Sequence, residues 1–180
     1  MNTGIKKEVV QIKGNERLRY LTAAGIMAAL ITLMTAYICH IPVGTNGGYV
    51  HFGDSLIYLT AAILPTPYAL AAAAIGGGLA DLLTAPMWMP ATIIIKMLIA
   101  LPFSHKGSKI VTPRNIGAAV LAYFISGIGY FVAEYILFGS WAVFLVSMLE
   151  SLVQSGGSAV FFILFGLALD KAHIKTRFWN

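Results

Sequence analysis

Charged residues are scarce in this sequence. Only 11% of its 180 residues are Asp, Glu, Lys or Arg, whereas 58% are apolar and the mean hydropathy is +0.81. A soluble domain contains roughly 25% charged residues, so the composition excludes an ordinary soluble fold and indicates an integral membrane protein. At about 20 residues per spanning helix, this length allows six spans and no large domain outside the membrane.

Cysteine and the common catalytic motifs are missing as well. The single Cys39 excludes an internal disulfide and a multi-cysteine metal site. The sequence has no G-x-x-x-x-G-K-[ST] loop for ATP phosphates, no G-x-S-x-G nucleophile motif and no H-E-x-x-H zinc motif. We therefore expect no catalytic residues, no metal and no cofactor. Energy for uphill transport would have to come from another subunit.

Breaks rich in proline and glycine divide the apolar sequence into six segments, because these residues end or bend helices. The predicted all-α fold has membrane spans at about 20–41, 52–65, 67–85, 89–103, 115–138 and 142–169. The second and fourth are short for a full crossing and would need tilt or shielding by neighbours. Together the spans form a substrate-binding domain, residues 20–170, between cytoplasmic tails at 1–19 and 171–180.

Basic residues distinguish the two faces of this predicted membrane domain. Five precede the first span, three lie between the fourth and fifth spans, and three follow the sixth. The loops on the opposite face contain no Lys or Arg. Since cytoplasmic loops are enriched in basic residues, we predict that both termini are cytoplasmic. The net charge of +5 comes from these basic residues at the ends of the spans. Their placement indicates that the charge orients the protein in the membrane and does not bind nucleic acid.

Several polar side chains fall inside the predicted spans, where an ionised group costs several kcal/mol unless it is paired or faces a polar cavity. They are Asp54, Asp81, Lys96, Glu134, Glu150 and Gln154. All fall in the outer half of the membrane or near its midplane, which predicts a ligand pocket open to the outside and argues against a continuous channel. Lys96 needs a carboxylate partner, for which Asp81, Glu134 and Glu150 are the candidates.

Aromatic residues and the H-F-G-D run at 51–54 complete the candidate pocket. Asp54 could equally cap a helix, and many of the aromatic residues could belong to an interfacial belt. Trp88 is distinguished by its position between Pro86 and Pro90, where a planar ligand could stack on it. The candidate substrate-binding residues are Tyr49, His51, Asp54, Tyr58, Asp81, Trp88, Lys96, Glu134, Glu150 and Gln154.

Three ordered motifs resemble the substrate-binding S components of energy-coupling factor (ECF) vitamin transporters. They are G-G-Y-V-H-F-G-D-S-L-I-Y, G-G-G-L-A-D-L-L and W-M-P-A-T-I-I-I-K, within residues 47–100. The resemblance implies a subunit of a prokaryotic plasma membrane that binds a water-soluble vitamin and associates with a transmembrane T component and two cytoplasmic ATPases. It also implies a lid at Pro42–His51 and a contact to the T component at Ala24 and Ala28. The spacing of these alanines alone favours packing within the chain.

The embedded charges give a first indication of the substrate. The predicted spans contain four carboxylates and one lysine. This excess of acids favours a ligand with a neutral or weakly basic planar ring, such as pyridoxine or the hydroxymethylpyrimidine precursor of thiamin. Pantothenate and riboflavin are the alternatives for an S component. An ion-coupled transporter working without ATPases is a further possibility. A membrane enzyme that uses Asp81, Glu134 or Glu150 as acid or base lacks a nucleophile–base pair.

Overall fold

The computed structural model describes residues 2–38, 40–43, 48–139, 141 and 144–179. These residues form α1 (Asn2–Ala36), β1 (Ile41–Val43), β2 (Gly48–Val50), α2 (Asp54–Ile63), α3 (Thr66–Thr84), η1 (Pro86–Trp88), α4 (Met89–Ala100), α5 (Pro113–Phe138), α6 (Phe144–Lys171) and α7 (Ile174–Trp179). The two short strands form an antiparallel hairpin in which Ile41 pairs with Val50. Apart from this hairpin the described chain is helical, as the sequence predicts.

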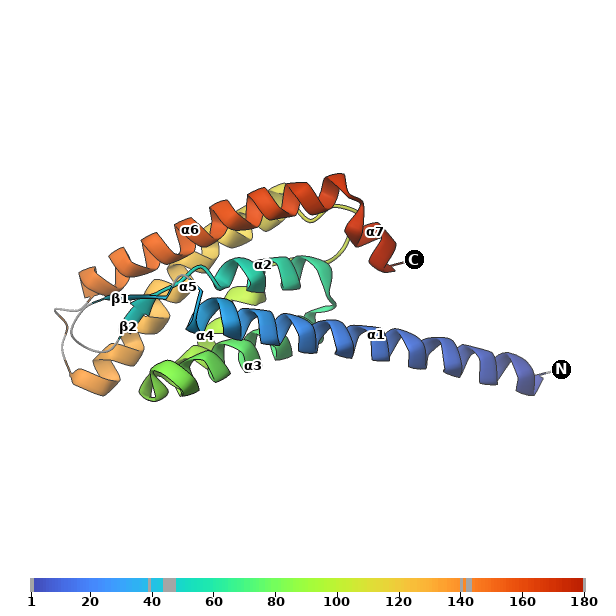
Figure 1. Ribbon diagram of the computed structural model, residues 1–180, viewed down its shortest axis with the longest axis horizontal. Coiled ribbons are helices and arrows are strands. Elements are labelled where there is room, and N and C mark those ends of the chain that lie inside the picture. Colours follow the sequence, from blue (N-terminus) through green and yellow to red (C-terminus); the bar gives the residue numbers. More distant parts are fainter. Residues whose placement is uncertain (1, 39, 44–47, 140, 142–143, 180) are drawn as a thin grey trace.

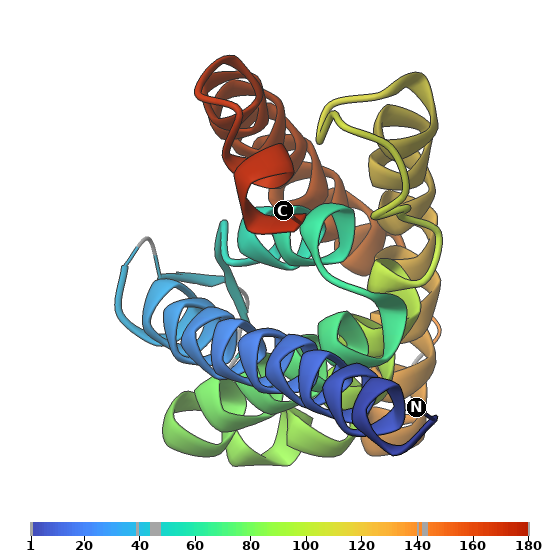
Figure 2. The same cartoon turned by 90° about the vertical axis from the view of Figure 1, so that its right-hand side faces the viewer.

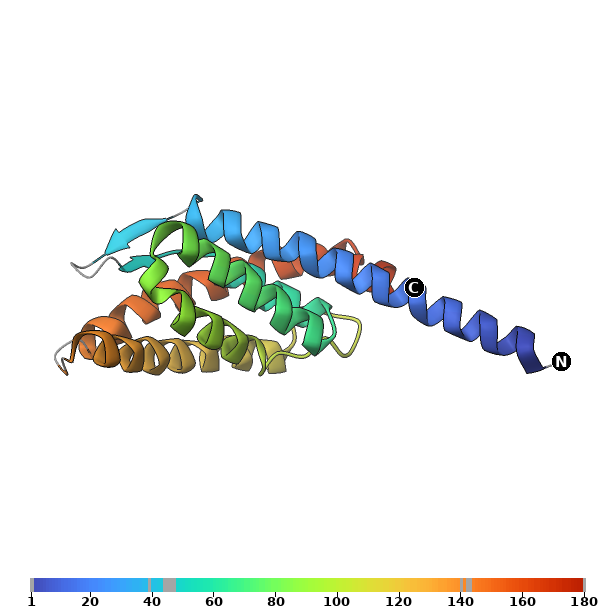
Figure 3. The same ribbon diagram turned by 90° about the horizontal axis from the view of Figure 1, so that it is seen from below.

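The long helices run back and forth along one axis of the molecule. Both termini, α7 and the connection between α4 and α5 lie at one end, while the hairpin and η1 lie at the other (Figures 1 and 3). Seen end-on, α2 lies between α6 and α1 (Figure 2). The basic residues after α4 and after α6 therefore gather at the end that carries the termini. The predicted separation of basic and uncharged loops is thus present as two opposite ends of the fold.

Among the described residues, four helices are long and apolar enough to cross a membrane: Gly14–Ala36, Thr66–Thr84, Pro113–Phe138 and Phe144–Lys171. Two further apolar helices, Asp54–Ile63 and Pro86–Ala100, are shorter. They correspond to the second and fourth predicted spans, which the sequence already marks as short. Large apolar side chains such as Leu33, Val120 and Phe165 are exposed on the long helices. A soluble protein rarely exposes so many, which agrees with lipid contact.

Two boundaries at the N-terminal side differ from the prediction. Residues 2–19 were expected to form a tail separate from the first span, but they continue α1 without a break. Apolar periodicity is absent there, yet the segment has no proline, so nothing in its backbone stops the helix. At its other end α1 stops at Ala36 and not near 41. The chain then enters the hairpin. The stretch Pro42–His51, which the resemblance implies as a lid, includes residues 44–47, which lie outside the described residues.

A run of three glycines on α3 brings the neighbouring helices close. A Cβ atom at Gly76 would lie 2.9 Å from the carbonyl oxygen of Ala28 on α1, and one at Gly77 would lie 2.7 Å from Cγ of Lys96 on α4. At Gly78 it would lie 2.8 Å from Cγ1 of Ile93. Each distance is shorter than a side chain tolerates, so the glycines allow this packing. Gly77 in particular leaves room for the Lys96 side chain.

Ala24 and Ala28 require a correction. The resemblance implies that they contact a partner subunit, but both are buried in the protein's own core on the side of α1 that packs against α3. A partner cannot reach side chains in this position. The spacing therefore serves packing within the chain, which was the alternative interpretation. Gly25 and Ala29 repeat the same four-residue spacing on the exposed side of α1.

Candidate functional site

A pocket opens toward the hairpin end of the fold and encloses about 560 Å³, counting its open mouth. Its walls come from β2, α3, η1, α5 and α6. The lining residues are Tyr49, His51, Asp81, Trp88, Tyr130, Glu134, Ser147, Glu150, Ser151 and Gln154. Only about 60 Å³ of this space is wide enough for a water-sized sphere, so the pocket is narrow and a drug-sized ligand would have to widen it. The pocket is at the end opposite the termini, on the side that the sequence assigns to the outside.

The structure brings together most of the candidate residues that the sequence suggests. Seven of the ten line the pocket: Tyr49, His51, Asp81, Trp88, Glu134, Glu150 and Gln154. The remaining three, Asp54, Tyr58 and Lys96, do not line it. Two of these form an ion pair beneath the pocket, and the third belongs to the core.

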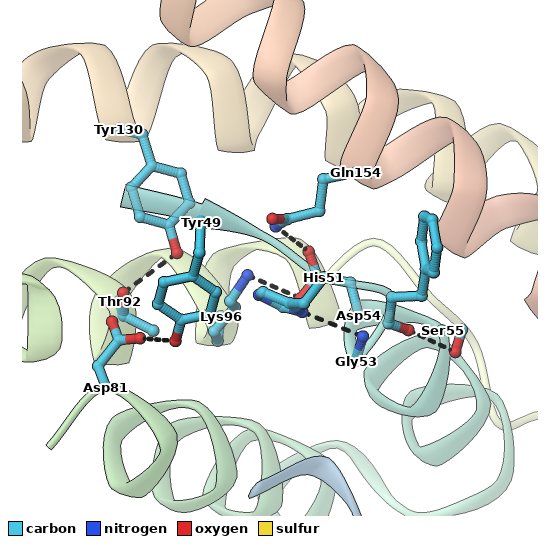
Figure 4. Close-up of polar contacts among 11 residues, drawn as sticks. Tyr49, His51, Gly53, Asp54, Ser55, Asp81, Thr92, Lys96, Tyr130 and Gln154 are labelled. Atoms are coloured by element: carbon cyan, nitrogen blue, oxygen red, sulfur yellow. Dashed lines mark hydrogen bonds and ion pairs between the residues drawn. The ribbon is translucent and has the colours of Figure 1, made fainter. Parts of the chain in front are cut away.

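Lys96 on α4 pairs with Asp54 at the start of α2. Nζ of Lys96 lies 2.7 Å from Oδ1 of Asp54, and both side chains are almost completely buried (Figure 4). The prediction that Lys96 pairs with Asp81, Glu134 or Glu150 is therefore wrong. The sequence places Asp54 near the outer start of the second span, where it could cap the helix or contact a ligand, and does not identify it as the partner of Lys96. However, α2 is short and lies between α1 and α6, so its first turn is inside the protein.

Gln154 connects this ion pair to the pocket. Its amide Nε2 donates a hydrogen bond of 2.9 Å to Oδ2 of Asp54, so both carboxylate oxygens of Asp54 have a partner (Figure 4). Nζ of Lys96 also lies 5.5 Å from the ring centroid of Tyr130, within the range of a cation–π contact. The lysine charge is thus held below the pocket floor and is not offered to a ligand.

Tyr58 lies one turn along α2 from Asp54 and is fully buried. Its ring stacks on Phe103, with centroids 4.8 Å apart and planes 16° apart. The prediction that it belongs to the pocket mouth is wrong, because α2 runs from the pocket toward the opposite end of the fold. Tyr58 instead joins α2 to the connection after α4.

The hairpin places Tyr49 and His51 over the pocket. The ring of Tyr49 stacks on His40 with centroids 3.9 Å apart, and its phenol donates a hydrogen bond to the Asp81 carboxylate (Figure 4). Burial and the Asp81 charge raise the pKa of Tyr49, so the phenol stays protonated and acts as a donor. Burial and the Lys96 charge lower the pKa of His51 to about 3. His51 is therefore neutral, and its Nδ1 accepts a 3.0 Å hydrogen bond from the Gly53 amide.

Three lining residues were not among the candidates: Tyr130, Ser147 and Ser151. Tyr130 lies four residues before Glu134 and therefore on the same face of α5. Its hydroxyl is 3.1 Å from Oγ1 of Thr92 on α4 (Figure 4). Ser147 and Ser151 share a face of α6 with Gln154, and Ser147 donates a hydrogen bond to Glu134. Helical spacing was the available signal, from Glu134 for Tyr130, from Glu150 for Ser147 and from Gln154 for Ser151.

The lining determines what the pocket can bind. It includes three carboxylates, of Asp81, Glu134 and Glu150, and no Lys or Arg. Trp88 lines the pocket but is buried, and its indole Nε1 has no hydrogen-bond partner among the described residues. Aromatic faces and carboxylate acceptors fit an uncharged planar molecule with hydroxyl or N–H groups. An anionic ligand would be repelled.

Comparisons with known proteins agree with this geometry. A family model described as "ECF-type riboflavin transporter, S component" matches residues 15–171, which include every residue that lines the pocket. The chain is also similar to a protein of Pyrococcus woesei described as "Uncharacterized protein in gap 3'region". The two are 30% identical over 112 residues, which cover 59% of this chain and 72% of that protein.

Proposed function

The chain belongs to the family of ECF-type riboflavin transporter S components, and from this premise we propose that it binds riboflavin for import into the cell. A member of this family is a subunit of a transporter. The choice of ligand rests on the pocket lining. The lining combines the aromatic rings of Tyr49, Trp88 and Tyr130 with three carboxylates, and it contains no Lys or Arg.

Riboflavin matches this lining group by group. Its fused ring is planar and uncharged, so it can stack between aromatic side chains. The hydroxyl groups of its ribityl chain can donate hydrogen bonds to Glu134 or Glu150, and its ring carbonyls can accept one from the Trp88 indole. Charged acceptors such as carboxylates make the stronger hydrogen bonds of this kind. The carboxylate cluster therefore favours a ligand rich in hydroxyl donors.

The other vitamins considered from the sequence fit less well. Pyridoxine and the hydroxymethylpyrimidine precursor, the first choices from the embedded charges, are single rings with fewer hydroxyl donors and smaller surfaces. Pantothenate is an anion, and Lys96, the one embedded cation that could bind it, is paired with Asp54. The family description supports riboflavin, which the sequence leaves open as an alternative.

We place the hairpin end outside and both termini in the cytoplasm of a prokaryotic cell. In this orientation the pocket faces the external medium and the basic end obeys the positive-inside rule. The four long helices cross the membrane, and α2 and α4 complete six spans because neighbouring helices shield their short lengths from lipid. The hairpin then acts as the lid, since Tyr49 of β2 and His51, which directly follows this strand, line the pocket.

Transport itself requires partners that supply energy. We propose a T component and two cytoplasmic ATPases as these partners, because the sequence contains no phosphate-binding loop of its own. The exposed side of α1 around Gly25 and Ala29 is the contact surface for the T component. Small residues four apart allow a second helix to approach closely in a membrane, and no side chain lies within 4 Å of the Gly25 Cβ position.

Ligand binding by the purified chain tests this function directly. Riboflavin fluorescence should be quenched on addition of the protein, and mass spectrometry should identify riboflavin as a co-purifying molecule. Trp88→Phe removes the free indole donor but keeps an aromatic ring, so riboflavin binding should weaken about tenfold. Trp141→Phe is the matched control, because Trp141 is exposed and does not line the pocket.

Two competitors make the test specific. Flavin mononucleotide adds a phosphate next to the carboxylates and should bind much more weakly than riboflavin. Pyridoxine should not displace riboflavin. Tight binding of pyridoxine or pantothenate without binding of riboflavin would overturn the proposed substrate.

A further inference from the structure

A second groove lies at the opposite end of the molecule from the substrate pocket, between α1 and the short helix α7. It encloses about 780 Å³, counting its open side. Asn15, Arg19, Thr22 and Ile26 of α1 form one wall, and Phe178 of α7 forms the other. Aromatic contacts of Tyr20 with Phe178 and Trp179 hold α7 against α1 (Figure 3).

The charged group of this groove is Arg19. Its guanidinium carbon lies 5.2 Å from the ring centroid of Phe178 and 5.6 Å from that of Tyr20. Its Nε atom is buried and has no hydrogen-bond partner among the described residues. The ion pair found in the described part of the chain is Lys96–Asp54, so no carboxylate neutralises Arg19 there. The aromatic rings orient the guanidinium and leave hydrogen-bond donors for an anion.

The polar groups of the α1 wall lie toward one end of the groove. Asn15 and Arg19, with Leu18 between them, lie nearest the end that carries the termini, whereas Ala23 and Ile26 lie farther along the helix. Ile26 lies seven positions after Arg19, which corresponds to about 10 Å of helix. Half of the hydrocarbon core of a bilayer is about 15 Å thick. A polar head at Arg19 therefore leaves room along this wall for the first two thirds of an acyl chain.

We propose that the groove binds one anionic phospholipid of the leaflet facing the end with the termini. The lipid phosphate contacts the Arg19 guanidinium, whose planar donors suit phosphate oxygens. One acyl chain lies along α1 toward Ile26, against the ring of Phe178. The exposed basic side chain of Arg177, on the same helix as Phe178, adds attraction for a headgroup with a net negative charge. This site does not depend on the identity of the transported ligand.

Native mass spectrometry of the purified full chain tests the proposal with phosphatidylglycerol and phosphatidylcholine as probes. One phosphatidylglycerol should be retained in preference to phosphatidylcholine. Arg19→Gln should lower its retention about fivefold, the effect of one basic residue at a membrane surface. Arg17→Gln is the matched control, since Arg17 is exposed on the same helix but does not line the groove, and it should have little effect. Thr22→Trp fills the groove and should also expel the lipid.

Other outcomes would overturn the proposal. Equal retention of the two lipids, or equal losses with Arg17→Gln and Arg19→Gln, would mean diffuse attraction by the basic end. Competition by glycerol 3-phosphate or inorganic phosphate at equal concentration would identify a site for free phosphate. If Arg19→Gln and Thr22→Trp left lipid retention unchanged but reduced co-purification of partner subunits, the groove would be a protein-docking site. An unchanged thermal unfolding temperature of both variants in detergent serves as the check of folding.

Discussion

The phenol of Tyr49 on β2 donates a hydrogen bond to the carboxylate of Asp81 on α3, and this bond joins the hairpin to the helical body at the pocket mouth (Figure 4). Both residues line the pocket. The stacking of Tyr49 on His40 adds a contact near the base of the same hairpin. Opening the hairpin as a lid would require this hydrogen bond to break first.

Tyr49→Phe removes the hydroxyl and keeps the stacked ring. A hydrogen bond to a charged group contributes about 1.5–3 kcal/mol, so riboflavin should dissociate at least about tenfold faster from the variant. Stopped-flow fluorescence measures this rate. Tyr37→Phe is the control, because Tyr37 is exposed and does not line the pocket. An unchanged dissociation rate in Tyr49→Phe would show that this bond does not hold the lid.

The Lys96–Asp54 ion pair predicts a large effect on stability. Lys96→Met leaves the Asp54 charge buried without its cation, which costs about 3–5 kcal/mol in the free energy of unfolding. Adding Asp54→Asn to this variant should restore part of the loss, because no charge is then left uncompensated. Thermal unfolding in detergent measures both variants against Lys106→Met, whose side chain is exposed. If Lys96→Met were as stable as the unchanged protein, the ion pair would not stabilise the fold.

Much of this architecture follows from local features of the sequence. Pro65, Pro86 and Gly139 fall at the ends of helices, where proline and glycine break the apolar runs. The embedded acids Asp81 and Glu134 lie in the pocket because polar groups in an apolar helix must face a cavity or a partner. These arguments need only the order of residues along the chain.

The partner of Lys96 could not be predicted from the sequence, because it depends on how the helices pack. The depth of Asp54 follows from how α2 lies between α1 and α6, and the sequence only indicates that α2 is short. Similarly, the side of α1 that faces α3 decides whether Ala24 or Gly25 is accessible. Both faces of α1 carry small residues four positions apart, so only the packing against α3 shows which face is buried and which is exposed.

The two faces of α1 predict opposite results for two similar substitutions. Ala24→Trp forces a large ring into the core next to α3 and should destabilise the fold by about 1–3 kcal/mol or more. Ala29→Trp places the same ring on the exposed face and should leave riboflavin binding intact while abolishing co-purification with the T component. The measurements are thermal unfolding and affinity purification of the complex. Assembly by Ala29→Trp at the normal level would show that the contact surface lies elsewhere.

His51 predicts how stability depends on pH. Its pKa is lowered from 6.5 to about 3 by burial and then by Lys96, so the unfolded chain takes up a proton below pH 6.5 that the folded chain does not. Stability is therefore complete above pH 6.5 and falls between pH 6.5 and pH 3. From pH 7.5 to pH 5 the loss from this group should be about 2 kcal/mol.

His51→Asn isolates this contribution, because the asparagine oxygen can replace Nδ1 as the acceptor for the Gly53 amide but does not titrate. The variant should lose less stability than the unchanged protein when thermal unfolding is compared at pH 7.5 and pH 5. His173→Asn is a control, since His173 is exposed in the turn before α7. If His51→Asn and the unchanged protein lost equal stability, the buried imidazole would not be the group that takes up the proton on unfolding.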